Sequence, residues 1–465
     1  MSEKMTEEQS RAMIDDLIAK SRAAFATYEH ATQEQVDAVC KAIAMAIFDH
    51  AEELAVLAVE ETGIGNVPDK IGKNTDVPSG MWNDMKGKKS VGVIKDDKEH
   101  RMLIIAKPRG ICCCVSPTTN PTITPMGNSM QALKCRNTMI ISPHPRALKT
   151  STKTVDYMRE AIEKVGFPAD LIQCVPIPSN YASQYLMSQV DTVIATGGSA
   201  MVKAAYSSGK PAYGVGPGNM QALIAPDYKD FDRAACDIIA GRSFDWGSVC
   251  AGDQICIVQQ KDEQAMIDAF RRNGAYVIED EPTVAKFREA IFTEDGHTRG
   301  ELVAHSPQVI ADAAGVEIPQ DTKIIVVKVT KYGADEPLCW EKLCPVTALI
   351  TYNTLEEAFE IAEANVRKIG IGHSSTIHSN DDATILAFAE RMPVGRIIVN
   401  NMGPSAAGAG SLNYFENTVS IGTGAWGGNM ISQNLTWEWL YQVTRIGYPR
   451  EGGSPSFEER WADPQ

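Results

Sequence analysis

The segment Val190-Asp-Thr-Val-Ile-Ala-Thr-Gly-Gly-Ser-Ala-Met-Val-Lys-Ala-Ala-Tyr-Ser207 contains a short apolar run, a glycine turn and a helix-forming run. We interpret 190–195 as a buried strand, 196–198 as the turn and 199–207 as a helix. Strand, turn and helix in this order form the unit of a parallel sheet with helices on both faces. Sheets of this kind bind ligands at the carboxyl ends of their strands.

The same unit recurs on both sides of this segment. In the first block the expected strands are 102–106, 111–115, 138–141 and 221–224. A second block begins near Tyr228, and its expected strands are 255–258, 276–279, 324–329, 346–351 and 396–400. The chain therefore predicts an α/β protein with two Rossmann-like, doubly wound parallel-sheet domains.

Composition places the chain among large folded proteins. Its 465 residues are 44% hydrophobic and 22% charged, which suits two or three domains with substantial cores. The formal net charge of -15 argues against a nucleic-acid partner, because no basic field attracts phosphates. No apolar run is long enough to span a membrane. Eleven cysteines without regular spacing or a Cys-x-x-Cys pair favour a reducing, cytoplasmic compartment and give no support for a metal site.

One cysteine stands in a loop that suits a nucleophile. The stretch Ser243-Phe-Asp-Trp-Gly-Ser-Val-Cys-Ala-Gly-Asp-Gln-Ile-Cys-Ile-Val258 places Cys250 between two glycines and before an apolar run. The run predicts a buried strand, so the thiol would lie at its mouth, where the glycines admit a substrate. The alternative is a small buried hydrophobe, which is the commoner state of a free cysteine. Trp246 is expected to narrow the pocket.

The turn Thr196-Gly197-Gly198-Ser199 is a candidate phosphate site. Its glycines allow a close approach, and the free N–H groups of the following helix favour an anion such as a pyrophosphate. A plain strand-to-helix connection explains the turn equally well. The loop Gly214-Val-Gly-Pro-Gly218 is a weaker candidate, because Pro217 removes a donor and the loop runs into a strand.

Three further side chains suit catalysis or ligand binding. Asn120 follows a buried strand and is able to stabilise an oxyanion, with turn formation as the ordinary alternative. Glu341 suits ribose hydroxyls, although most glutamates simply face water. His373 stands in a small-residue loop, where an imidazole either moves protons or has a structural role.

Together these pieces resemble the aldehyde dehydrogenase superfamily, and specifically its CoA-acylating branch. That branch includes the N-terminal half of bifunctional aldehyde–alcohol dehydrogenases and the microcompartment aldehyde dehydrogenases. The similarity extends from the first helices to about Asn434. Its motifs are Pro117-Thr-Thr-Asn-Pro-Thr122, Ser142-Pro-His-Pro-Arg146, Ala195-Thr-Gly-Gly198, the stretch 201–211, Ser243-Phe-Asp with Cys250, and Ala425-Trp-Gly-Gly-Asn429.

The resemblance implies a role for each catalytic candidate. Cys250 matches the family nucleophile. Asn120 matches the amide of the oxyanion hole, which works with the main-chain N–H of Cys250. His373 falls where related acylating enzymes carry a histidine near the thiol.

The resemblance also implies a cleft for NAD, with NADP as the alternative, and for coenzyme A as co-substrate. Glu341 matches the glutamate that binds the nicotinamide ribose. The other matching positions are Thr196, Gly197, Gly198 and Ser199 at the pyrophosphate, and Ser142, Pro143 and His144 at the adenosine ribose.

One departure from the family pattern bears on the reaction. Hydrolytic members carry a glutamate that activates water, in the segment that reads Tyr213-Gly-Val-Gly-Pro-Gly-Asn219 here. Val215 takes the place of that acid, so the thiol of CoA becomes the better nucleophile. The resemblance therefore implies NAD-dependent oxidation of a short aldehyde, such as acetaldehyde or propionaldehyde, to an acyl-CoA. The alternatives are an acylating sulfoacetaldehyde dehydrogenase and a hydrolytic aldehyde dehydrogenase.

The family pattern also suggests a division of the chain. Residues 1–98 and 110–228 would form the cofactor-binding domain, and 229–428 the catalytic domain with Cys250. Residues 99–109 and 429–465 would form an oligomerisation β-arm and a tail. A homodimer or homotetramer in the cytoplasm, or in a bacterial microcompartment, is the implied assembly.

Overall fold

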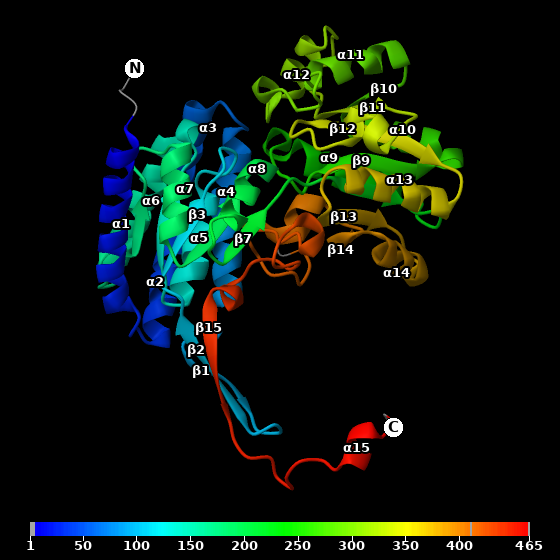
Figure 1. Ribbon diagram of the computed structural model, residues 1–465. Coiled ribbons are helices and arrows are strands. Elements are labelled where there is room, and N and C mark those ends of the chain that lie inside the picture. Colours follow the sequence, from blue (N-terminus) through cyan, green and yellow to red (C-terminus); the bar gives the residue numbers. More distant parts are fainter. Residues whose placement is uncertain (1–4, 410–411, 464–465) are drawn as a thin grey trace.

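The computed structural model describes residues 5–409 and 412–463. Its strands form three sheets, of five, seven and three strands. The two larger sheets, each covered by helices, lie side by side, and the small sheet projects away from them (Figure 1). The fold class predicted from the sequence is therefore confirmed.

The five-stranded sheet has the order β5-β4-β3-β6-β7, and all its strand pairs are parallel. Its strands are β3 (Ile111–Val115), β4 (Thr138–Ser142), β5 (Ile172–Cys174), β6 (Thr192–Thr196) and β7 (Ala212–Val215). One face packs against α2 (Gln33–Asp49), α5 (Ile123–Lys134) and α6 (Leu148–Lys164). The other face packs against α1 (Glu7–Tyr28), α7 (Asn180–Gln189) and α8 (Ser199–Tyr206).

The cysteine run in β3 follows the two-residue period of a strand. Cys112 and Cys114 lie in the core on the α2 side, while Cys113 lies in the core on the α1 side. Burial raises the pKa of Cys112 and Cys114 to about 12. These three thiols therefore serve packing.

The seven-stranded sheet has the order β10-β11-β12-β9-β8-β13-β14, again with parallel pairs. Its strands are β8 (Met220–Ile224), β9 (Asp253–Gln259), β10 (Ala275–Ile278), β11 (Ile324–Lys328), β12 (Val346–Tyr352), β13 (Gly372–His378) and β14 (Val394–Val399). Helices α9 (Phe231–Ser243) and α10 (Glu263–Arg272) cover one face. The other face is covered by α11 (Glu281–Ile291), α12 (Pro307–Ala313), α13 (Leu355–Lys368) and α14 (Asp382–Arg391).

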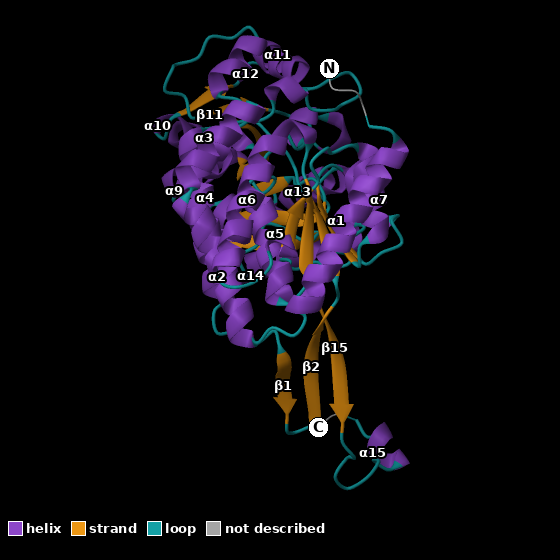
Figure 2. Ribbon diagram, turned by 90° about the vertical axis from the view of Figure 1, so that its left-hand side faces the viewer, coloured by secondary structure: helices purple, strands orange, loops and turns teal. Residues whose placement is uncertain are grey.

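A three-stranded antiparallel sheet forms an arm. It consists of β1 (Gly92–Asp97), β2 (Met102–Pro108) and β15 (Tyr441–Gly447), with β2 in the middle. Figure 2 shows the arm extending from the body, with the short helix α15 (Phe457–Trp461) beyond it. The remaining helices, α3 (Ala51–Thr62) and α4 (Val67–Met85), pack beside α2 and α6 in the first domain.

The structure differs from the expected division of the chain at two points. Strand β8 pairs with β9 and β13, so the chain enters the second sheet after Val215 and not at residue 228. Residues 431–440, expected in the arm and tail, instead place Ile431, Leu435 and Trp437 in the core of the first domain. An apolar run predicts a strand or a buried segment, but it does not say which sheet or core the segment joins.

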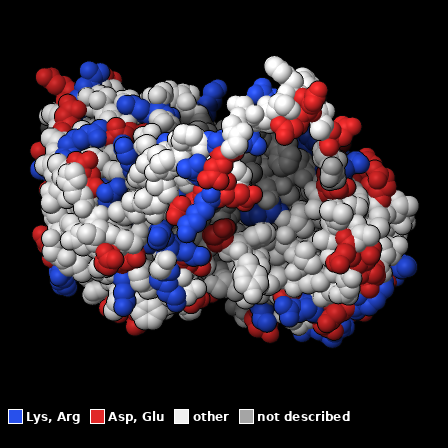
Figure 3. Space-filling view, turned by 90° about the horizontal axis from the view of Figure 1, so that it is seen from below, with Lys and Arg blue, Asp and Glu red and all other residues white. Residues whose placement is uncertain are grey.

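Charged side chains of both signs lie on the surface of the molecule. Figure 3 views the molecule from below and shows acidic and basic side chains mixed over this face. None of the helices in the described residues is long and apolar enough to cross a membrane.

Substitution Phe287→Ala should destabilise the second domain by about 3–5 kcal/mol, because Phe287 on α11 is fully buried in its core. The midpoint of urea unfolding, followed by tryptophan fluorescence, measures the change. The control Phe457→Ala removes a ring that is 76% exposed and should alter stability by less than about 0.5 kcal/mol. Equal midpoints for the two variants would contradict the core assignment.

Candidate active site

Cys250 lies in the loop between α9 and β9, at the junction of the two domains. Helix α9 ends at Ser243, and a short 3-10 turn, Phe244–Gly247, follows it. Asp245 and Trp246 both adopt left-handed backbone conformations, with φ of 49° and 51°. Such conformations cost roughly 1–2 kcal/mol for each non-glycine residue, so contacts from outside the loop must hold it in this shape.

The buried carboxylate of Asp245 provides those contacts. It accepts hydrogen bonds from Lys70 Nζ at 3.0 Å, from Lys73 Nζ at 2.5 Å and from Ser248 Oγ at 2.7 Å. It also accepts one from the main-chain N of Asn66 at 3.0 Å. Burial opposes ionisation of Asp245, but the charges of Lys73 and Lys70 outweigh it and lower the pKa of the carboxyl. The nucleophile loop is thus tied to α4 of the first domain.

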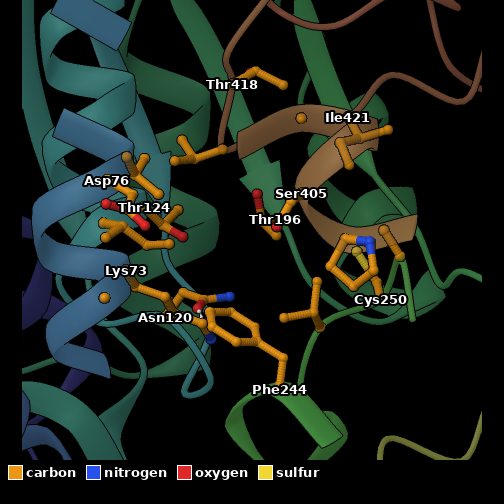
Figure 4. Close-up of a pocket in the computed structure, with 18 of the residues that line it drawn as sticks. Lys73, Asp76, Asn120, Thr124, Thr196, Phe244, Cys250, Ser405, Thr418 and Ile421 are labelled. Atoms are coloured by element: carbon orange, nitrogen blue, oxygen red, sulfur yellow. Dashed lines mark hydrogen bonds between the residues drawn. The ribbon is translucent and has the colours of Figure 1, made fainter. Parts of the chain in front are cut away.

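An apolar cavity of about 360 Å³ opens in front of the Cys250 thiol. Figure 4 shows Lys73 and Asn120 on one side of it and Cys250 on the other. Phe244 lines this cavity, whereas Trp246 lines a separate pocket near the N-terminus of α4. The sequence therefore predicted an aromatic wall near the thiol but assigned it to the wrong residue.

His373 is the side chain in contact with the thiol. Its Nε2 lies 3.3 Å from Cys250 Sγ. The residue was expected in a loop, but it is the second residue of the buried strand β13, after Gly372 with φ of 84°. Burial lowers the pKa of His373 to about 3, with the charge of Arg396 adding to the effect. Burial likewise raises the pKa of Cys250 to about 12, and the nearby Glu341 carboxylate adds to the rise. Both groups are therefore uncharged at rest.

Asn120 follows β3 and lines the cavity, as an oxyanion donor must. Its Oδ1 accepts a hydrogen bond from Lys73 Nζ at 2.9 Å. That bond fixes which end of the amide is the acceptor, and it leaves the Nδ2 donor with only a long contact of 3.4 Å to Thr119 Oγ1. The donor is therefore available to a ligand in the cavity.

Glu341 lies in the loop before β12 and is buried beside the nucleophile. Its Oε1 accepts a hydrogen bond from the main-chain N of Gly218 at 2.9 Å, and burial raises its pKa to about 7. A Cβ at Gly218 would lie 2.1 Å from the carbonyl oxygen of Cys250. The loop Gly214–Gly218, the weaker phosphate candidate, therefore uses Gly218 to pack closely against the main chain of Cys250. Close packing of this kind is a different role from phosphate binding.

The turn from β6 to α8 has the features of a phosphate site. An added Cβ at Gly198 would meet nothing within 4 Å, so the main chain is open there. The Oγ1 of Thr196 is buried and has no hydrogen-bond partner within the part of the chain that is described. An open turn at a helix N-terminus with an unsatisfied hydroxyl fits a phosphate group, and Ser199 begins that helix.

The three residues expected at the adenosine ribose differ in accessibility. Ser142 is buried, and its Oγ is hydrogen-bonded to Ser183 Oγ at 2.8 Å. Pro143 is also buried, whereas His144 is exposed and caps a short helix by accepting from the main-chain N of Arg146. Contact with a ribose stays a prediction for all three, with His144 the most accessible side chain.

Sequence reasoning missed the charged residues that hold the site together. Lys70 and Lys73 lie in a segment that showed no clear pattern, and Asp245 was noted only as part of a motif. Arg396 was noted only as the first residue of an expected strand. The one available signal was the spacing of the two lysines, which places them on the same face of a helix.

Comparisons with known proteins identify the family of the chain. The model of the aldehyde dehydrogenase family matches residues 4–278 and 327–412. The chain is 45% identical to the acetylating succinate-semialdehyde dehydrogenase of Clostridium kluyveri, over 96% of this chain and 98% of that protein. It is 38% identical to a sulfoacetaldehyde dehydrogenase of an Acholeplasma species, over 97% and 94% of the two chains. The crystal structure of an acetylating aldehyde dehydrogenase from Geobacillus thermoglucosidasius superposes with a TM-score of 0.92 at 36% identity, over 96% and 98%.

The chain therefore belongs to the aldehyde dehydrogenase family, as its motifs predicted. The names of these relatives describe acetylating or sulfoacetaldehyde enzymes, which agrees with the branch expected from the sequence.

Substitution Asp245→Asn should destabilise the protein by about 3–5 kcal/mol, because it leaves two buried ammonium groups without their shared carboxylate. Urea unfolding of the single variants Asp245→Asn and Lys73→Met and of the double variant measures the coupling. The double variant should lose clearly less than the sum of the two single losses. Simple additivity would show that the ion cluster does not hold the loop.

Proposed function

We propose that this protein oxidises a short aldehyde to the corresponding acyl-CoA, with NAD as oxidant and a thioester on Cys250 as intermediate. The observation that carries the proposal is a thiol that faces a substrate-sized cavity whose wall, in the described residues, has no carboxylate beside the sulfur. Val215 lines that cavity where hydrolytic relatives carry a glutamate. The one carboxylate on the cavity wall in the described residues, Asp76, lies across the cavity from Cys250 (Figure 4).

The first step is addition of the Cys250 thiolate to the aldehyde carbonyl. The carbonyl oxygen becomes an oxyanion, and the Nδ2 donor of Asn120 stabilises it together with the main-chain N–H of Cys250. A preorganised donor of this kind contributes about 3 kcal/mol to the transition state. Lys73 supports the step because it fixes the orientation of the Asn120 amide.

When bound, NAD or NADP would supply the hydride acceptor for oxidation of the Cys250 adduct to the thioester. The residues that would hold the dinucleotide are the Thr196–Ser199 turn for its diphosphate and Glu341 for its nicotinamide ribose. The open glycine turn and the unpaired Thr196 hydroxyl support this placement. The carboxylate of Glu341 would exchange its bond to Gly218 for the ribose hydroxyls.

The second step is attack of the CoA thiol on the thioester, which forms acyl-CoA and returns the Cys250 thiolate. His373 is the side chain in contact with the sulfur, and it is proposed to accept the proton of the CoA thiol. CoA shares an adenosine diphosphate with the dinucleotide, so both are expected to use the same cleft in turn.

The cavity favours a short, largely apolar aldehyde, because Val77, Ile123 and Val419 line it together with Phe244. An aldehyde with an anionic end is the second candidate. Two relatives are named for such substrates, succinate semialdehyde and sulfoacetaldehyde. Lys73 is the cation on the cavity wall that would attract the anionic group, and the Lys70, Lys73 and Asp245 cluster carries one excess positive charge when all three are ionised.

The assembly and the compartment complete the proposal. The antiparallel arm leaves β1 and β15 as open edges, which suits pairing with a second copy in a homodimer or homotetramer. All eleven cysteines are free thiols, which supports a reducing compartment such as the cytoplasm or a microcompartment.

NADH formation in the native protein should need CoA for sustained turnover, whereas Cys250→Ala should form no NADH with or without CoA. Absorbance of NADH with a panel of acetaldehyde, propionaldehyde, succinate semialdehyde and sulfoacetaldehyde is the measurement. Without CoA, we expect at most one NADH per site, because the acyl-enzyme accumulates. Many turnovers per site without CoA would refute the acylating assignment, and a fully active Cys250→Ala variant would refute the nucleophile.

Substitution Val215→Glu should introduce CoA-independent turnover, because it restores a carboxylate that is able to activate water against the thioester. Val215→Gln is the matched control, since it has the same shape without a basic group. The steady NADH rate without CoA should rise at least roughly tenfold in the glutamate variant, a modest share of what general-base catalysis supplies. No difference between the two variants would show that position 215 does not face the acyl group.

A further inference from the structure

Arg396 on β14 is a buried cation without an anionic partner. Its side chain is 5% exposed, and no Asp or Glu of the described residues forms an ion pair with it. Burial lowers its pKa to about 10, and an interaction with Cys250 opposes that change. Burying an unpaired charge is costly, and arginine is rarely fully buried without a counter-ion. Within the described residues, neutral hydrogen-bond acceptors surround its guanidinium, so its charge is not cancelled by a carboxylate.

The hydrogen bonds of Arg396 tie it to the strand that carries His373. Its Nη2 donates to the main-chain carbonyl of His373 at 2.8 Å, and its Nε donates to Ser374 Oγ at 3.0 Å. Further donations reach the carbonyls of Gly422 at 2.5 Å and Ser432 at 2.8 Å. The guanidinium is thus hydrogen-bonded to the main chain of His373, and the ring of the same residue contacts Cys250 Sγ.

The His373 ring is suited to donate to the sulfur. Its Nδ1 is buried and has no partner within the described part of the chain. A neutral ring with its proton on Nε2 leaves only an acceptor unpaired, which is more tolerable than an orphaned N–H. The Nε2–H then faces Sγ at 3.3 Å. The positive charge of Arg396 disfavours a second proton on the ring.

We propose that Arg396 is a positioning residue that supplies the counter-charge of the Cys250 thiolate and keeps His373 a neutral hydrogen-bond donor to it. The inference rests on the proposed role of Cys250 as nucleophile. It departs from a thiolate–imidazolium pair, in which the histidine itself would carry the positive charge. To accept the proton of the CoA thiol at Nε2, the ring has to take the other neutral tautomer, with its own proton on Nδ1.

Other charged groups also affect the pKa of the Cys250 thiol. Glu341, before β12, opposes the thiolate, whereas Lys73 on α4 favours it. Lys73 shares the Asp245 carboxylate with Lys70, and its effect on the pKa of Cys250 is smaller than that of Arg396. Loss of Arg396 is therefore expected to raise the pKa of Cys250 more than loss of Lys73.

The test is the rate of Cys250 alkylation by iodoacetamide at fixed pH values between about 7 and 9, well below the pKa of the thiol, with the background of Cys250→Ala subtracted. In Arg396→Gln alkylation should be roughly tenfold slower, which corresponds to a rise of about one unit in the pKa of Cys250. Arg396→Lys, which keeps the charge but loses several hydrogen bonds, should stay near the native rate. Arg391→Gln, which removes a surface cation on α14, should match the native protein.

Two results would overturn the proposal. One is a native alkylation rate in a folded Arg396→Gln variant, and the other is an equal slowing in the glutamine and lysine variants. A second measurement uses the native protein and does not depend on the fold of a variant. The ring signals of His373, assigned with His373→Asn, should not titrate by NMR above about pH 5, and an inflection near the ordinary histidine value of about 6.5 would also overturn it. Failure of Cys250→Ala to abolish NADH formation would instead refute the proposed function itself.

Discussion

The buried carboxylate of Asp245, shared by Lys70 and Lys73, is the interaction on which the arrangement of the site depends. The carboxylate belongs to the nucleophile loop of the second domain, and both lysines belong to α4 of the first. Through Lys73 the same cluster reaches Asn120, on the loop after β3. One hydrogen-bonded network therefore sets the distance between the thiol and its oxyanion donor. A mobile connection between the domains would leave those groups too loosely placed for catalysis.

Burial of the Cys250 thiol and of the His373 ring determines their protonation states. Burial alone pushes the pKa of Cys250 up and that of His373 down, so neither group is charged in the resting protein. A thiolate in such a place is stabilised by a nearby positive charge, and the guanidinium of Arg396 is hydrogen-bonded to the main chain of the histidine. Val215, on the cavity wall, has no group able to activate a water molecule.

The frame of the molecule is shared with relatives along nearly the whole chain, as a TM-score of 0.92 and an identity of 36% to one solved structure show. Val215 lines the cavity beside the thiol and has no group able to activate water. In the described residues, the wall of this cavity combines apolar side chains from both domains with Lys73 and Asp76.

Local patterns in the sequence determined the fold class and the family. Buried parallel strands are continuous apolar runs, so most strands of both sheets were predictable, including β9 beside Cys250 and β6 before the glycine turn. The motifs around Cys250 and Asn120 identified the family, which the comparisons confirm. The sequence alone did not reveal β13, because Gly372 and the polar residues His373, Ser374 and Ser375 hide a strand that is nevertheless fully buried.

Only the tertiary structure decided which charges meet. Lys73 and Asp245 are 172 positions apart, and Arg396 reaches His373 across neighbouring strands. No local period encodes such pairs, because an ion pair or a buried hydrogen bond depends on where two distant elements are brought together. The candidate nucleophile Cys250 was thus recognisable from its own segment. Its electrostatic surroundings depend on how the two sheets, α4 and the C-terminal segment pack around it.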